Sequence, residues 1–452
     1  MPRRVVMKFG GTSVQDPDAI RRLIGIARDA AAANGAPPVV VVSALSGVTD
    51  GLVQIARLVE DGDGAAAAAI LSALLERHLS VAAAVTTSSR DRVAEFLRRA
   101  VSELSGLVHA LAVLREVSAR SRDAVHATGE VLSSIIVAAA LDDAGTAADA
   151  VDARTVLVTD AEHTAAAPEM IETCERCRKR VAPIVARGRI PVLGGFIGAT
   201  SNGVTTTLGR GGSDYSAAIF GACLGVEEIQ IWTDVDGMLT ADPRIVAEPR
   251  VVPLLSFAEA SELAYFGAKV LHPSTILPAV SKNIPVRILN SRRPANEGTL
   301  ITAEGRADGT LTAIACKRDV TVVDITSTRM LMAHGFLRRL FEVFERFRTA
   351  VDVVTTSEVS VSVTVDDTRR LEALVENLRH FAEVACEPEM AIVSAVGENL
   401  RSDATLFGRA INALDRIPLR LVSQAASRRN LTFVLRNADV PEAMKRLHET
   451  FF

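Results

Sequence analysis

Short runs of β-branched residues alternate with longer helical stretches through roughly the first two thirds of the chain. Parallel strands need crossover connections, which are usually helices that pack on the faces of the sheet. The alternation therefore predicts an α/β domain with a mainly parallel sheet and helices on both faces. The runs that read as buried strands are residues 5–9, 39–43, 190–193, 229–232 and 286–289.

The chain changes character beyond this domain. Residues 292–312 are rich in Gly, Pro, Asn and charged side chains, and we place the main boundary there. A β-α-β-β-α order then occurs twice, which predicts two ferredoxin-like βαββαβ units. Residues 51–120 show no strand signal and look like a helical excursion that covers one side of the sheet, and we assign no role to the helical stretch 62–123. The expected division is a first domain at 1–293, a linker at 294–312, and two smaller domains at 313–388 and 389–452.

The composition narrows the class of protein. Hydrophobic residues make up 48% of the chain and charged residues 23%, so large cores can form without disulfide or metal cross-links. The net charge is −4. No block of Lys and Arg stands out, which argues against nucleic acid or an anionic membrane as partner. The N-terminal residues lack an apolar signal region, and the longest apolar runs are far shorter than the roughly 18 residues of a membrane helix. We therefore expect a soluble, cytoplasmic protein.

The cysteines indicate no metal site. Cys174 and Cys177 form a lone C-x-x-C in a charged helical stretch. A zinc site would need a second pair, or histidines at ligand spacing, and neither is found. We expect reduced, structural thiols at all five cysteines, the others being Cys223, Cys316 and Cys386.

Glycines and small hydroxyl residues follow the first two strands. Gly10 and Gly11 let backbone approach a ligand closely, and Lys8 beside them supplies a positive charge. The order is neither a Walker A loop nor a G-x-G-x-x-G fingerprint, and a plain strand-end turn is an equal alternative. Thr49 closes the hydroxyl-rich stretch 43–50, where open α/β sheets bind ligands, although a helix cap would look the same.

The stretch 205–214 is the most informative segment. It contains hydroxyl residues, three glycines, Arg210, Ser213 and Asp214, and a helix is expected from Tyr215. Glycines ahead of a helix N-terminus form a cradle for anions. The guanidinium of Arg210 can meet a carboxylate through two hydrogen bonds. A structural turn would not need this set of side chains, so we interpret the segment as functional.

Three further features are less specific. Glu130 stands in the first turn of an apolar helix, where the helix dipole favours a carboxylate and Thr128 can act as the cap. The alternative is that Glu130 faces inward and holds a substrate ammonium. Thr233 and Asp234 stand where a strand enters an acidic loop, and Lys269 lies in a helical region before His272.

Taken in order, these motifs resemble the amino-acid kinase superfamily, and specifically the aspartate kinases. The C-terminal repeat resembles two ACT modules, and residues 355–360 resemble the monofunctional, lysine-sensitive branch. The resemblance covers nearly the whole chain except residues 62–123. The matching stretches are residues 8–13, 194–198, 205–214, 232–244 and 256–273.

The resemblance implies roles for individual residues. Lys8 and Asp214 would be catalytic, with Asp214 orienting Lys8. The residues that would bind L-aspartate are Thr49, Glu130, Arg210 and Ser213. ATP, carried with Mg²⁺, would contact Lys8, Gly10, Gly11, Thr233, Asp234, Leu239, Arg244 and Lys269, although Leu239 departs from the pattern because similar enzymes often have Tyr there.

The implied reaction is the ATP-dependent phosphorylation of aspartate to 4-phospho-L-aspartate, the first step of lysine, threonine and methionine biosynthesis. A carboxylate nucleophile is already ionised and needs no general base, but its approach to the phosphates calls for cations and amide donors. Glu130 and Arg210 together favour an acceptor with an ammonium and a second carboxylate. Glutamate differs by one methylene, worth only about 1–3 kcal/mol. A glutamate kinase and a non-catalytic amino-acid sensor are the alternatives.

The resemblance also implies regulation by an amino acid, bound between the ACT modules of two subunits in a homodimer. Two carboxylates suit L-lysine, with its two ammonium groups, better than threonine. Ala333 and Ala350 stand where similar enzymes can carry hydroxyl residues, so threonine stays open. A strand near 312–317 would complete the second module. The implied effector residues are Met330, Gly335, Phe336, Leu337, Val351, Asp352, Ser357 and Glu358.

Overall fold

The computed structural model describes residues 3–267, 273–305, 311–330, 334–424 and 428–452. By their contacts these residues divide into two compact units. The first is Met1–Met238 with Val270–Ala303, and the second is Leu239–Lys269 with Glu304–Phe452. Residues 239–269 thus belong to the second unit, although they precede the linker expected at 294–312.

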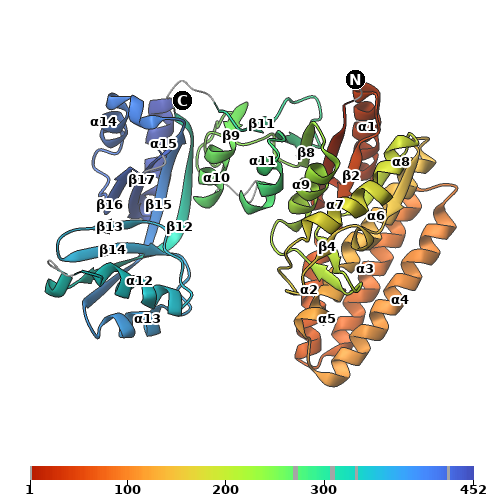
Figure 1. Ribbon diagram of the computed structural model, residues 1–452, viewed down its shortest axis with the longest axis horizontal. Helices are drawn as coiled ribbons and strands as arrows, with labels where there is room; N and C mark the ends of the chain where they lie inside the picture. Colours follow the sequence, from red (N-terminus) through yellow and green to blue (C-terminus); the bar gives the residue numbers. More distant parts are fainter. Residues whose placement is uncertain (1–2, 268–272, 306–310, 331–333, 425–427) are drawn as a thin grey trace. The chain divides into compact units, whose positions relative to one another are not determined.

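The first unit contains a mainly parallel sheet (Figure 1). Its order is β3 (Ala148–Val151), β5 (Ile190–Gly194), β2 (Val39–Val42), β1 (Val5–Phe9), β8 (Glu228–Thr233), β10 (Val286–Asn290) and β11 (Thr299–Thr302). Only β11 is antiparallel to its neighbour β10. All of β1 and β2 is buried, as strands covered on both faces should be. The register places Phe9 beside Val42 and Trp232, so β1, β2 and β8 end at the same edge.

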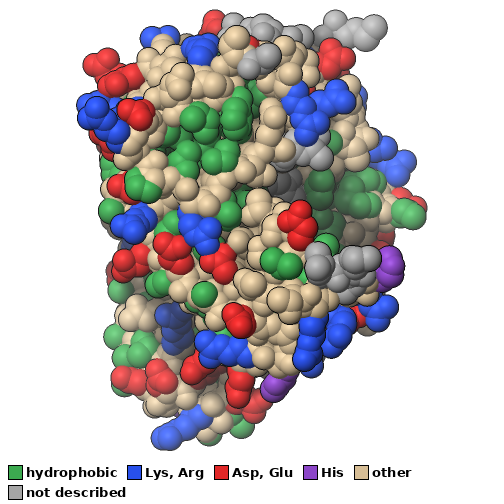
Figure 2. Space-filling view, turned by 90° about the vertical axis from the view of Figure 1, so that its left-hand side faces the viewer, with side chains coloured by type: hydrophobic (Ala, Val, Ile, Leu, Met, Phe, Trp, Pro, Cys, Tyr) green, Lys and Arg blue, Asp and Glu red, His purple; other side chains and the backbone are tan. Residues whose placement is uncertain are grey.

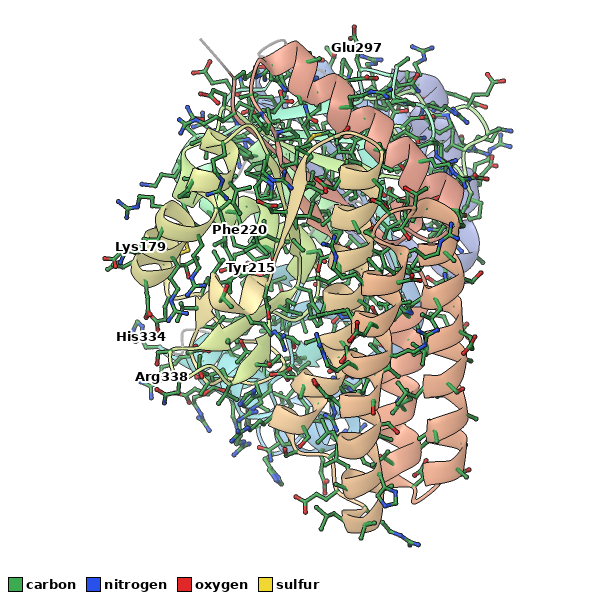
Figure 3. All side chains as sticks on the ribbon, turned by 90° about the vertical axis from the view of Figure 1, so that its right-hand side faces the viewer. Lys179, Tyr215, Phe220, Glu297, His334 and Arg338 are labelled. Atoms are coloured by element: carbon green, nitrogen blue, oxygen red, sulfur yellow. A yellow bond between two sulfur atoms is a disulfide. The ribbon has the colours of Figure 1, made fainter. Side chains whose placement is uncertain are left out.

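Helices cover both faces of this sheet. One face is covered by α1 (Pro17–Asn34) and α6 (Thr128–Asp143), beside a helical layer of α2 (Val48–Glu60), α3 (Gly64–Val85), α4 (Arg90–Leu114) and α5 (Ala119–His126), whose long helices Figure 3 shows side by side. The other face carries α7 (Met170–Arg180), α8 (Ala182–Ala186), α9 (Gly212–Leu224) and α11 (Leu277–Ser281). A small separate sheet contains β4 (Val158–Thr159), β6 (Ile197–Thr200) and β7 (Thr205–Thr207).

Local sequence sets the helix boundaries, as α1 illustrates. The Asp16 carboxylate accepts a hydrogen bond of 2.8 Å from the amide of Ala19, and Pro17 occupies the first helical position. Gly35 ends the helix with a φ of 65°, a left-handed conformation that glycine adopts at little cost.

Two helical stretches are long and apolar enough to meet the criteria for a membrane span, namely α3 and residues 119–143. The second has 72% of its apolar window buried inside the protein, as a core helix would have, and the first has 22%. Length and hydropathy therefore do not by themselves assign a membrane span to either.

The second unit contains an antiparallel sheet. Its order is β13 (Val354–Thr356), β14 (Ser360–Val365), β12 (Leu311–Thr326), β15 (Glu383–Gly397), β17 (Asn430–Arg436) and β16 (Leu421–Gln424). The long strands β12 and β15 run through both halves of the sheet. Residues 311–317 pair with residues 392–397, and the register becomes irregular between Lys317 and Val320.

Each half of this sheet has its own hydrophobic core. In one half, α12 (Phe336–Arg346) and α13 (Leu371–Leu378) pack on Val323 and Val363. In the other, α14 (Ala404–Ala413) and α15 (Val440–Phe451) pack on Val393 and Phe433. The unit also contains β9 (Leu254–Ser256) and α10 (Phe257–Tyr265). The predicted fold class, a parallel α/β domain followed by two ferredoxin-like modules, is confirmed.

The cysteine prediction was wrong for one pair. Cys174 of α7 and Cys223 of α9 form a disulfide, with their Cα atoms 4.6 Å apart. The C-x-x-C spacing gave no sign of this, because the partner lies 49 residues away on a helix that packs against α7. Cys177 is free and buried, and burial raises the pKa of its thiol to about 12.

Candidate active site

A cleft of about 690 Å³ opens at the carboxyl ends of β1 and β2. Its lining comes from the end of β1 and the loop after it, the loop from β2 into α2, α5, the start of α6, the loop from β7 into α9, and from Thr164 and Phe196. Seven of the predicted site residues line it, namely Lys8, Gly11, Thr49, Glu130, Arg210, Ser213 and Asp214. They come together because the carboxyl ends of parallel strands meet at one edge.

Lys8 and Asp214 form an ion pair in this cleft. The Nζ of Lys8 lies 2.6 Å from Oδ1 of Asp214, and their side chains are 11% and 13% exposed. Asp214 lies in the first turn of α9, which begins at Gly212 rather than at Tyr215 as predicted. The amides of that first turn therefore also face the site, where a helix N-terminus favours an anion.

Close backbone packing explains two of the glycines. A Cβ on Gly195 would lie 2.7 Å from Cβ of Ser213, and one on Gly129 would lie 2.7 Å from Cβ of Ala44. Larger residues would push α9 away from the end of β5 and α6 away from the end of β2. These glycines thus set the width of the cleft.

Glu130 is a buried carboxylate with an incomplete hydrogen-bond set. Its Oε1 accepts a bond of 3.2 Å from the amide of Ala44, and its Oε2 is buried with no partner among the described residues. Burial raises the pKa of Glu130 to about 8. A cationic ligand group in the cleft would supply the missing partner and favour the ionised form.

The capping alternatives for these motifs do not hold. Gly47, not a hydroxyl residue, is the N-cap of α2, and it makes no side-chain cap bond. Thr128 donates back to the carbonyl of Ala124 at 3.3 Å instead of capping α6. Arg210 is exposed at the cleft and makes no hydrogen bond or ion pair with any described residue. Its guanidinium is therefore free to meet a ligand.

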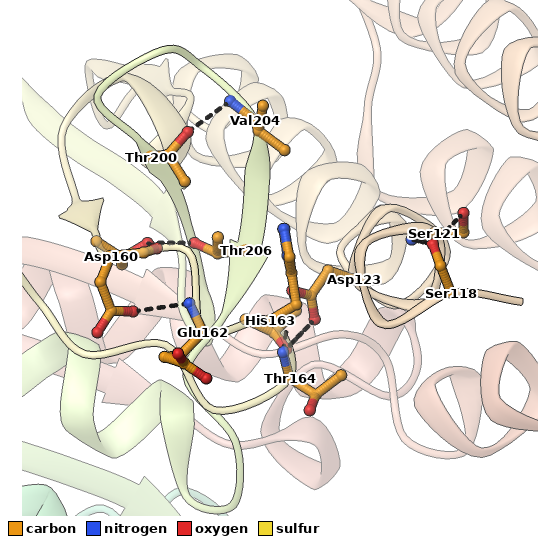
Figure 4. A network of polar contacts seen from close by, with 12 residues as sticks. Ser118, Ser121, Asp123, Asp160, Glu162, His163, Thr164, Thr200, Val204 and Thr206 are labelled. Atoms are coloured by element: carbon orange, nitrogen blue, oxygen red, sulfur yellow. Dashed lines mark hydrogen bonds and ion pairs between the residues drawn. The ribbon is translucent and has the colours of Figure 1, made fainter.

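A buried acidic residue fixes the strand that leads to Arg210 (Figure 4). Asp123 of α5 accepts hydrogen bonds from the amide of Thr164, from Nδ1 of His163 at 2.7 Å and from the hydroxyl of Thr207 at 2.6 Å. Thr207 ends β7, three residues before Arg210. The position of the loop that carries Arg210, between β7 and α9, thus depends on α5.

Sequence reasoning missed several residues of the cleft. Arg122 and His126 line it with Glu130, and the three follow each other at intervals of four residues along α5 and α6. That spacing places them on one helical face, a signal that was available in the sequence. Burial lowers the pKa of His126, whose Nε2 is buried without a described partner. Phe196 also lines the cleft, at a φ of 66° that is unusual for a non-glycine residue.

The predicted ATP-contact residues are distributed over both units. Gly10 donates its amide to the carbonyl of Trp232 at 3.0 Å, so it lies where β8 enters the Thr233–Asp234 turn. Leu239 and Arg244 belong to the second unit, where Arg244 bonds Asp242 at 2.6 Å. Lys269 lies outside the described residues.

The predicted effector residues fall into two groups within the second unit. Met330 ends a short 3₁₀ turn, and the amide of nearby Ser327 donates to Val359 at 2.8 Å, next to Ser357 and Glu358. Gly335 starts α12, followed by buried Phe336 and exposed Leu337. Val351 and Asp352 lie just before the N-terminal end of β13, whereas Ser357 and Glu358 follow its C-terminal end. Five residue steps of chain lead from Asp352 to Ser357, roughly 16 Å at about 3.3 Å per step if extended.

Asp352 is buried and already paired. Its side chain is 2% exposed, and its Oδ1 accepts bonds of 2.7 Å from Nζ of Lys317 and from the hydroxyl of Tyr265. Its Oδ2 has no partner among the described residues. Lys317 also pairs with Asp366 at 2.7 Å. Burial and the hydrogen bond to Asp352 raise the pKa of Tyr265.

Comparison with known proteins gives the family. A sequence model of the amino acid kinase family matches residues 3–290, and an ACT domain model matches residues 393–451. The chain is 36% identical to chloroplastic aspartokinase 3 of Arabidopsis thaliana, over 99% of this chain and 81% of that protein. It is 33% identical to lysine-sensitive aspartokinase 3 of Escherichia coli over 100% of both. The structure of E. coli aspartokinase III with aspartate and ADP matches with a TM-score of 0.82, at 33% identity over 99% of both chains. This chain therefore belongs to the amino acid kinase family and, within it, to the aspartokinases.

Proposed function

We propose that this chain transfers the γ-phosphoryl group of ATP to the side-chain carboxylate of L-aspartate, giving 4-phospho-L-aspartate and ADP. The observation that carries the proposal is the buried, unpartnered Oε2 of Glu130 in a cleft that also holds the free guanidinium of Arg210. The ammonium of aspartate complements the first and its α-carboxylate the second. The side-chain carboxylate is then left to react.

The chemistry requires no proton transfer. An oxygen of the side-chain carboxylate attacks the γ-phosphorus, the bond from that phosphorus to the bridging oxygen breaks, and ADP leaves with the electron pair. Lys8, held by Asp214, supplies positive charge for the phosphoryl group, and the N-terminal turn of α9 adds amide donors. Nothing in the cleft needs to act as a general base.

Glu130 makes acceptor binding sensitive to protonation. With a pKa of about 8 it is mostly protonated at neutral pH in the empty cleft. An arriving ammonium favours the carboxylate form, so a proton leaves as aspartate binds. A neutral or purely anionic acceptor would gain nothing from this residue.

ATP would enter with Mg²⁺ on its phosphates. Among the described residues no group of three or more His, Cys, Asp or Glu side chains forms a cage for the ion. The nucleotide would therefore be its main ligand, as is usual for this small, strongly hydrated cation.

L-lysine is the proposed inhibitor, bound between two copies of the chain in a homodimer. The E. coli relative that matches over its full length is lysine-sensitive. The roughly 16 Å between Asp352 and Ser357 exceeds the reach of one amino acid, which favours a site shared by two copies. Leu337, Phe341 and Val354 expose apolar side chains. Figure 2, in which the left-hand side of Figure 1 faces the viewer, shows hydrophobic side chains gathered in places on that side.

The direct test is ADP release from Mg-ATP with L-aspartate or L-glutamate, each with and without lysine or threonine. Aspartate-dependent release that lysine suppresses is the expected result. A preference for glutamate would make the chain a glutamate kinase. No release with either acceptor, from folded protein, would favour a non-catalytic sensor. Light scattering checks the dimer, and a monomer in the presence of lysine would contradict the shared site.

A further inference from the structure

One residue of the α3–α4 hairpin reaches two loops of the cleft. Nη1 of Arg77 donates to the carbonyl of Ser46 at 2.7 Å, and Nη2 donates to the carbonyl of Gln15 at 3.1 Å. Ser46 belongs to the loop that leads into α2, whose second residue is Thr49, on the proposed acceptor side. Gln15 follows the 3₁₀ turn η1 (Gly11–Ser13) on the proposed phosphate side. A single guanidinium thus joins the two loops.

The geometry suits an arginine in particular. Its planar fork holds two carbonyl oxygens in fixed directions, which a lysine ammonium cannot do. The amide of Ser46 also donates to the carbonyl of Gly11 at 3.2 Å, so the loops have one further link. Gly47, next to Ser46, has a φ of 80°, a left-handed conformation that favours glycine. Arg77 bonds the residue just before this turn.

We propose that Arg77 is a positioning residue that fixes the loop around Ser46, the acceptor loop, against the loop around Gln15, the phosphate loop. This rests on the proposed function, because the distance between the two loops matters only if the ligands bound at these loops react with each other. In-line transfer depends on the distance between the attacking oxygen and the γ-phosphorus, and an error of about 1 Å can cost about 100-fold in rate. The helical excursion thereby gains a role in the reaction.

Arg77→Met keeps the aliphatic stem and removes both bonds, and it should lower kcat about 10- to 100-fold. KM for ATP and for aspartate should change much less, because each loop still binds its own ligand. Arg77→Lys should recover part of the lost kcat. Arg21→Met is the matched control: Arg21 also links α1 to α3, through the carbonyl of Ala84 at 2.9 Å, but touches neither loop.

A wild-type chain without aspartate-dependent ADP release would contradict the proposed function itself. With an active wild type, an unchanged kcat in Arg77→Met would overturn the positioning role. Equal losses in Arg77→Met and Arg21→Met, with equal drops in melting temperature, would also overturn it, because they would indicate stability alone.

A second inference rests on a separate observation in the other unit. An effector ammonium that binds Oδ1 of Asp352 would displace the ammonium of Lys317, which already lies 2.7 Å from that oxygen. Lys317 can stay paired with Asp366, because Oδ2 of Asp366 also lies 2.7 Å from Nζ of Lys317. The side chain of Asp366 is 42% exposed. The unpartnered Oδ2 of Asp352 then offers a second hydrogen-bond acceptor to the ammonium of the effector.

We infer that Lys317 is an internal competitor for the effector carboxylate and raises the lysine concentration needed for inhibition. This rests on the proposed lysine regulation. Lys317→Met removes the competitor and should lower the half-inhibitory lysine concentration about two- to fivefold, the scale of one partly exposed ion pair. Asp366→Asn should raise it, because Lys317 is then left with Asp352 alone.

Arg420→Met is the matched control. Arg420 likewise bridges two carboxylates of the second unit, but these are Asp324 and Glu387 and not Asp352. Its loss should leave lysine inhibition unchanged. An unchanged or higher half-inhibitory concentration in Lys317→Met would overturn the competitor role. If neither wild type nor Lys317→Met responds to lysine, both the competitor and the lysine proposal fail, whereas a response of the variant alone would support both.

Discussion

Glu130 of the first unit and Asp352 of the second are both buried carboxylates, and each has one oxygen without a described partner. Their other contacts differ. Glu130 receives one backbone amide and forms no ion pair with the described chain. Asp352 receives the Lys317 ammonium and the Tyr265 hydroxyl. The protein thus neutralises one buried carboxylate itself and leaves the other to a ligand.

The difference shows how two sites for amino acids can respond differently. A buried, unpaired carboxylate is costly, so Glu130 holds its proton until a cation arrives. A ligand of Asp352 must instead exchange with an existing partner. Under the proposed function, the cleft would select its acceptor through the unpaired carboxylate of Glu130, and the proposed lysine site would be tuned by the ammonium of Lys317.

The largest expected effect separates chemistry from recognition. Lys8→Met should lower kcat by about 10²- to 10³-fold, because it removes the cation beside the transferred phosphoryl group. Lysine binding, measured by calorimetry, should stay unchanged because Lys8 belongs to the other unit. Loss of lysine binding in a folded variant would contradict the division of roles.

Glu130→Gln should raise the KM for aspartate about 10- to 100-fold, the scale of a charge-assisted hydrogen bond. The amide keeps the shape of the side chain and cannot ionise. Steady-state kinetics give KM, and circular dichroism serves as the folding control. A KM within twofold of wild type would mean that Glu130 does not hold the acceptor.

Asp352→Asn should raise the half-inhibitory lysine concentration about tenfold while kcat without lysine stays the same. The matched control is Asp324→Asn, which breaks the corresponding pair with Arg420. The comparison of the two carboxylates would fail if Asp352→Asn changed the KM for aspartate and left lysine inhibition intact.

The pH dependence is the smallest effect. Glu130 must lose a proton for the ammonium to bind, so the KM for aspartate should fall several-fold between pH 7 and pH 8.5 and then level off above its pKa of about 8. Kinetics across that range measure the trend in wild type and in Glu130→Gln. A slope that persists in the variant would assign it to another group.

The site was predictable where strand ends and glycines mark it. Lys8, Thr49 and the segment that holds Arg210 and Asp214 come from three separate stretches, and one shared edge of a parallel sheet brings them together. Arg77 could not be found in this way, because its role depends on how a helical excursion packs against distant carbonyls. The same holds for Lys317 and Asp352, whose pairing depends on side-chain packing in the second unit.

The central claim is that the unpaired carboxylate of Glu130 binds the ammonium of the acceptor. Its most direct test compares L-aspartate with succinate, which lacks the ammonium, as acceptors in ADP release from Mg-ATP. The account predicts a kcat/KM at least about 10- to 100-fold higher for aspartate, and a preference that largely disappears in Glu130→Gln. Equal use of aspartate and succinate by the wild-type chain would contradict it.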